Sequence, residues 1–188
     1  MTETTMHLPP ATSTADRGTG PLGWLAAIWG VGGVVLLLGN AVARLAPMAV
    51  EAIRGPLGFL EWGSLVACVA FMGFFEGYRG FQLGFSPRVV SRAVHLARQP
   101  RPALVLLAPL FCMGLVHASR KRLTVSWILT AGIVGLVIAV RQVPQPWRGI
   151  LDAGVVVGLS WGIVAILAFG LRALAGRPPA MQVELPRR

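Results

Sequence analysis

The chain has 188 residues, of which 55% are hydrophobic and only 13% are charged, and its formal net charge is +10. A soluble domain carries about 25% charged residues, so this composition excludes an ordinary soluble domain and predicts a membrane protein. Positive charge also suits nucleic acid, but here the arginines lie at the ends of apolar segments. They predict contact with anionic lipid headgroups and no binding of nucleic acid.

The first part of the chain predicts a tail followed by two membrane spans. Residues 1–20 are rich in Thr, Pro, Ser and Gly and lack an apolar period, which is typical of a disordered tail. Apolar segments follow at Leu22–Ala43 and Leu57–Gly77. Each provides the roughly 20 apolar residues that cover ~30 Å of hydrocarbon. Because these segments are continuous rather than alternating, and only helices or closed barrels can cross a bilayer, both are predicted to be helices.

A basic amphipathic segment, Ser86–Gln99, follows the second span. It begins with Ser-Pro, a pair that favours the start of a helix. Its polar residues recur on one helical face, whereas small and aliphatic residues fill the rest. This pattern predicts a short interfacial helix in the headgroup plane, with Arg88, Arg92 and His95 in contact with lipid headgroups. The alternative is a loop helix packed on its own protein.

The number of spans depends on Pro102–Ala118, which has 17 residues and contains Pro109 near its middle. It is either a short span or a re-entrant segment, because proline frees a backbone carbonyl there. Two further spans are predicted at Leu123–Val140 and Ile150–Leu171. Five spans divide the basic residues eight against nine, which gives no orientation. Four spans divide them thirteen against four, with both termini on the basic, cytoplasmic side.

We therefore expect an all-α integral membrane protein, a bundle of four to five transmembrane helices. Four spans with a re-entrant segment are slightly preferred, and five spans are the close alternative. The membrane domain covers residues 21–172, and residues 173–188 form a second loose tail.

Three carboxylates lie within or at the edge of predicted spans, at Glu61, Glu76 and Asp152. Acidic groups inside a membrane are costly and often mark an ion or proton route. However, Arg79 lies three residues after Glu76, and Arg148 lies four residues before Asp152, close enough for pairs within one helix. The favoured interpretation is therefore carboxylates paired with arginines at the membrane boundary.

Glycines recur every four residues along two of the predicted spans. They lie at Gly154, Gly158 and Gly162 in the last span and at Gly73 and Gly77 in the second. Small residues at this spacing let two helix backbones approach closely. These glycines are therefore predicted to be helix-packing positions, either within the chain or against another subunit.

No motif for catalysis, cofactor binding or metal binding is evident in the sequence, which lacks Gly-x-Ser-x-Gly, His-Glu-x-x-His and a phosphate-binding glycine loop. We expect no catalytic, cofactor or metal site. The predicted function is a non-catalytic accessory, scaffolding or assembly subunit in a bacterial inner membrane. Its expected partners are the bilayer, anionic headgroups and a membrane protein or a second copy. A small transporter or channel that uses the three carboxylates is the alternative, and a lipid-acting membrane enzyme is third.

Overall fold

The computed structural model describes residues 20–100 and 102–180, with the side chains at positions 121 and 122 excepted. Nearly all of the predicted N-terminal tail and half of the C-terminal one lie outside these ranges. Every regular element in the described part of the chain is a helix, and four helices are long and apolar enough to cross a membrane. The prediction of an all-α membrane bundle with four spans is thus confirmed.

Helix α1, Pro21–Arg54, has 34 residues and is about 51 Å long. It extends eleven residues beyond the predicted span, through Pro47 to Arg54. The extension is held because Ala49 and Ala52 are buried near the start of the last helix. The apolar composition predicted which part of α1 can lie in hydrocarbon. The full length of the helix depends instead on its packing against the last helix.

The second span is part of one continuous helix of 40 residues, Phe59–Arg98. It comprises α2 (Phe59–Met72), a π-helix η2 (Gly73–Phe85) and α3 (Ser86–Arg98). The helix predicted at 86–99 is present as α3, but α3 continues η2 without a break and is not a separate interfacial helix. Its Val89 and Leu96 lie in the bundle core, where α3 packs against α1, α5 and α7.

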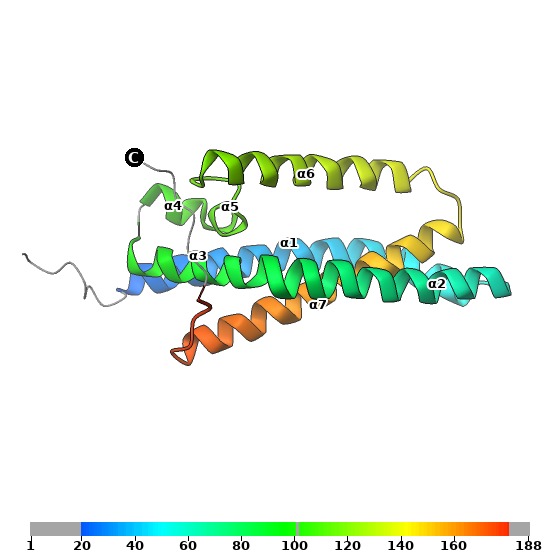
Figure 1. The fold of residues 1–188 in the computed structure, drawn as a ribbon, viewed down its shortest axis with the longest axis horizontal. Coiled ribbons are helices and arrows are strands. Elements are labelled where there is room, and N and C mark those ends of the chain that lie inside the picture. Colours follow the sequence, from blue (N-terminus) through cyan, green and yellow to red (C-terminus); the bar gives the residue numbers. More distant parts are fainter. Residues whose placement is uncertain (1–19, 101, 181–188) are drawn as a thin grey trace, which may run out of the picture.

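The segment Pro102–Ala118 forms two short helices instead of a span. Helix α4, Pro102–Leu106, has five residues and α5, Ala108–Met113, has six. Gly114 ends α5 with a φ of 80°, in the left-handed region that glycine adopts without strain. Both helices lie where α3 ends and the next long helix begins (Figure 1), so the chain does not cross the bundle here.

The last two spans, α6 (Arg120–Val140) and α7 (Trp147–Leu174), differ in how they pack. Helix α7 lies against α1, α2, η2 and α3, whereas α6 has no extensive contact with another element in the described part of the chain. Figure 1 shows α6 running alongside the bundle, apart from the other three long helices. The start of α1 and the end of α7 lie at the same end of the molecule, the end that carries α4 and α5.

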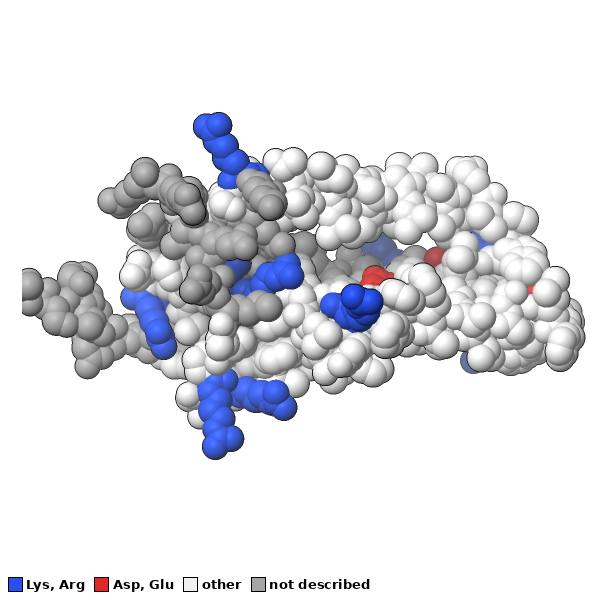
Figure 2. Space-filling model, viewed as in Figure 1, with Lys and Arg blue, Asp and Glu red and all other residues white. Residues whose placement is uncertain are grey.

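The basic residues are distributed unevenly between the two ends of the molecule. Arg98 ends α3, Arg120 begins α6 and Arg172 lies in the last turn of α7, all at the end that carries α4 and α5. Arg54 and Arg148 lie at the opposite end. On the face shown in Figure 2, basic side chains gather mainly over the half with α4 and α5.

Candidate functional site

The glycine face of α7, formed by Gly154, Gly158 and Gly162, lies directly against α2 and η2. All three glycines are buried, and their four-residue spacing places them on one side of the helix. A Cβ atom added at any of them would come closer than 3.0 Å to a side chain of the opposite helix. The atoms it would meet first are Cys68 Sγ at 2.7 Å, Glu76 Oε2 at 2.6 Å and Phe81 Cδ1 at 2.5 Å, in that order. Only glycine fits this interface without movement of its neighbours.

The π-helix η2 keeps its side chains in register with these glycines. Met72 lies against Gly154, and Glu76 and Phe81 lie against the next two glycines, so the partner residues are four and then five positions apart. In an α-helix, residues 72 and 81 would lie on opposite sides, because nine residues make two and a half turns. The i→i+5 bonding of a π-helix widens each turn and brings Phe81 back to the interface.

Sequence reasoning missed this π-helix. The signal that accompanies it is four glycines within twelve residues, Gly73, Gly77, Gly80 and Gly84. Of these, Gly77 faces α7, where an added Cβ would lie 3.0 Å from Trp161. At Gly73 the corresponding distance to Val157 is 3.6 Å, an ordinary van der Waals contact. The second predicted glycine pair, Gly73 and Gly77, therefore also faces α7, and the packing is looser at Gly73.

Glu76 is held in this interface with one carboxylate oxygen unsatisfied. Its Oε2 is buried and has no hydrogen-bond partner in the structure. The predicted ion pair with Arg79 is not formed among the described residues. A buried polar atom without a partner costs free energy, so the side chain lies here at the expense of stability.

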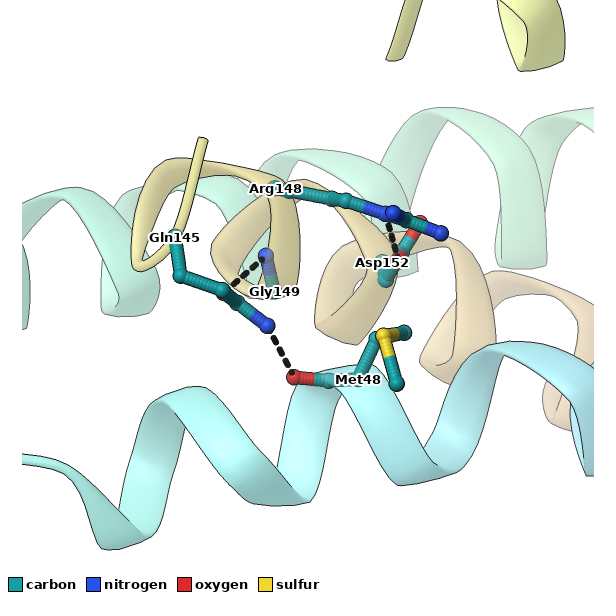
Figure 3. A network of polar contacts seen from close by, with 5 residues as sticks. All are labelled: Met48, Gln145, Arg148, Gly149 and Asp152. Carbon is teal, nitrogen blue, oxygen red and sulfur yellow. Dashed lines mark hydrogen bonds and ion pairs between the residues drawn. The ribbon is translucent and has the colours of Figure 1, made fainter. Parts of the chain in front are cut away.

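Asp152 lies in a polar network at the start of α7 (Figure 3). Its side chain is nearly fully buried, and its Oδ2 is 3.8 Å from Nε of Arg148, which matches the predicted pair. Just before α7 begins, Gln145 accepts a hydrogen bond from the backbone N–H of Gly149 (3.1 Å) and donates one to the carbonyl of Met48 (3.3 Å). The network therefore ties the beginning of α7 to α1.

Glu61 has a local role at the start of α2, where its carboxylate accepts a hydrogen bond from the backbone N–H of Gly58. The three candidate carboxylates are thus not brought together. Glu61 and Glu76 are fifteen residues, about 22 Å, apart along one helix. Asp152 precedes Gly158, the residue that faces Glu76, by six residues or about 9 Å.

Arg92 is buried, contrary to the prediction that it faces lipid headgroups. Its side chain is 5% exposed, and its Nε donates to the carbonyl of Phe111 at 2.6 Å. Its Nη2 donates to the carbonyls of Val116 (3.2 Å) and His117 (3.1 Å), and the guanidinium lies 4.3 Å from the centre of the Phe111 ring. A cation at the C-terminal end of α5 is also favoured by the helix dipole. Arg92 therefore holds the turn after α5.

The other two predicted headgroup residues, Arg88 and His95, are partly buried. The ring of His95 stacks at 6.5 Å from that of Phe111, which places it toward α5. Helical periodicity placed these residues on one face of α3. It did not show that α5, which follows α3 in the chain, covers that face.

The groups described here do not form a metal centre, because no cluster of three or more His, Cys, Asp or Glu side chains occurs among the described residues. The chain matches no protein-family model, and no curated protein or solved structure matches it.

Proposed function

We propose that this chain is a non-catalytic accessory or assembly subunit of a bacterial inner membrane, with both termini in the cytoplasm. The observation that carries this proposal is the separation of α6 from the other three spans. A span that its own bundle does not hold is available to a transmembrane helix of another protein. The orientation is supported by the basic residues that gather at the end where α1 begins and α7 ends.

Helix α6 has the surface that such an association requires. All residues from Ala131 to Ala139 are exposed. Within this stretch Ala131, Gly135 and Ala139 recur every four residues, and a Cβ added at Gly135 would meet nothing within 4 Å. In membranes, helices associate largely through close van der Waals contact across small residues. This ridge therefore allows a partner helix to approach the α6 backbone.

A small transporter or channel remains the second candidate, and the buried, unpartnered Oε2 of Glu76 is the observation that favours it. The other two carboxylates weigh against it. Glu61 is used as a cap and Asp152 lies beside Arg148, so each has a local role. A route would need further polar groups near Glu76, which faces Gly158 across the interface.

The proposal is tested by purifying the full chain from its native membrane in mild detergent, with the Gly135→Leu and Val137→Leu variants in parallel. Val137 lies on the opposite side of α6 from the ridge, because two residues rotate the helix by about 200°. We expect a partner band on a native gel for the parent and for Val137→Leu. For Gly135→Leu we expect that band to be at least tenfold weaker, with unchanged thermal stability. A parent chain that purifies alone as a monomer contradicts the proposal.

A further inference from the structure

A groove of about 580 Å³ runs along α7 beside the glycine face, and Gln82 of η2 contributes to its lining. This volume lies within the range of small-molecule sites, 300–1,000 Å³. The groove extends from Val156 to Arg172, sixteen residues or about 24 Å along the helix. It is therefore longer than the ~15 Å that one leaflet contributes to a hydrocarbon core of ~30 Å.

The lining of the groove is mostly apolar, with Ser160 and Gln82 as its uncharged polar residues, and it carries one cationic residue. The apolar walls are formed by Val156, Val157, Val164, Ala165, Ala168 and Phe169. Trp161 is 44% exposed and donates a hydrogen bond from its ring nitrogen to Gln82 at 2.7 Å. Because this bond joins α7 to η2, it fixes the Trp161 ring as part of the wall.

Arg172 provides the cationic end. It lies in the last turn of α7, at the end of the molecule where basic side chains gather. Its guanidinium is 5.8 Å from the centre of the Phe169 ring, a residue that also lines the groove. The side chain is exposed, and a guanidinium is suited to bidentate hydrogen bonds with phosphate.

We propose that this groove binds an anionic glycerophospholipid, with one acyl chain along α7 and the phosphate at Arg172. The apolar walls fit the chain, the cationic end fits the headgroup, and the length of the groove exceeds one leaflet. The site is distinct from the α3 face predicted from the sequence, where Arg92 is buried. The proposed lipid site goes beyond the accessory function and does not depend on α6. A negative result for either proposal therefore leaves the other unaffected.

The test is native mass spectrometry of the full chain with equal amounts of phosphatidylglycerol and phosphatidylcholine. Arg172→Gln is compared with Arg120→Gln, which removes an exposed arginine elsewhere at the same end of the molecule. We expect Arg172→Gln to reduce retained phosphatidylglycerol roughly fivefold, to the level of phosphatidylcholine, because a near-surface basic residue contributes ~1 kcal/mol to binding of an anionic lipid. Arg120→Gln is expected to behave like the parent.

A second pair of variants tests the groove itself. Ala168→Trp places a large ring in the groove, and Ala67→Trp makes the same change on α2, outside the groove lining and outside the α6 ridge. Both alanines are exposed, so the bundle is expected to fold in each case. Ala168→Trp should reduce retention of both lipids, whereas Ala67→Trp should not. Equal phosphatidylglycerol retention by Arg172→Gln and Arg120→Gln, or by Ala168→Trp and Ala67→Trp, overturns the proposal.

Discussion

Helices α6 and α7 have nearly equal apolar character but opposite roles in the fold. Their most apolar stretches have mean hydropathies of 2.3 and 2.2, yet 33% of that stretch is buried in α7 and 6% in α6. Both contain small residues at four-residue spacing. In α7, Gly158 is in contact with Glu76, whereas Gly135 of α6 has no neighbour within 4 Å. Hydropathy therefore determines which segments can enter a membrane, and matching surfaces determine which of them pack together.

The comparison requires first that α6 crosses the membrane. If it does, cysteines placed at its two ends should differ completely in their reaction with a thiol reagent that cannot cross the membrane. A cysteine at Ser119 should resist a membrane-impermeant thiol reagent in intact cells, whereas a cysteine at Gln142 should react. The reason is the proposed orientation, in which the end with most of the basic residues faces the cytoplasm. The parent, with its own Cys68 and Cys112, gives the background. Equal labelling at positions 119 and 142 would show that α6 does not cross the membrane.

The same substitution in the two helices should have very different effects on stability. Gly158→Leu should lower the free energy of unfolding by about 3 kcal/mol, because overpacking a tight interface costs 1–3 kcal/mol and the added side chain meets Glu76 at once. Gly135→Leu should change it by less than about 0.5 kcal/mol. Thermal melting in detergent measures both values.

The control for this prediction is Val156→Leu, which adds leucine two residues from Gly158, outside the glycine face. Neither substitution should prevent insertion, because leucine is more apolar than glycine and about as apolar as valine. Similar melting curves for Gly158→Leu and Val156→Leu would mean that the glycine face does not hold the bundle together.

A smaller loss of stability is expected when Arg92, which holds the turn before α6, is replaced. Arg92→Gln removes the guanidinium that binds three carbonyls, and the loss of stability should be about 2 kcal/mol, since an unsatisfied buried acceptor costs 1–3 kcal/mol. Arg98→Gln is the control, because Arg98 is exposed at the end of the same helix. Limited proteolysis of residues 114–119 should be faster in Arg92→Gln alone. Equal cleavage of the two variants would show that Arg92 does not hold this turn.

Several features of the fold could be predicted from the sequence because they depend on residues close together in the chain. The four spans follow from continuous apolar segments, since insertion depends on local composition. The four-residue spacing of Gly154, Gly158 and Gly162 likewise places them on one face of a helix whatever lies opposite. The Arg148–Asp152 pair lies within a single turn and is similarly local.

Other features depended on contacts between segments that are distant in the chain, and only the tertiary structure decided them. Arg92 is buried because α5 and the turn after it place three carbonyls around its guanidinium. The π-helix keeps Phe81 at the interface opposite Gly162, which lies 81 positions later in the chain. Helices α6 and α7 could not be told apart by composition, because burial depends on the shape of the neighbouring helix as well as on a segment's own hydropathy.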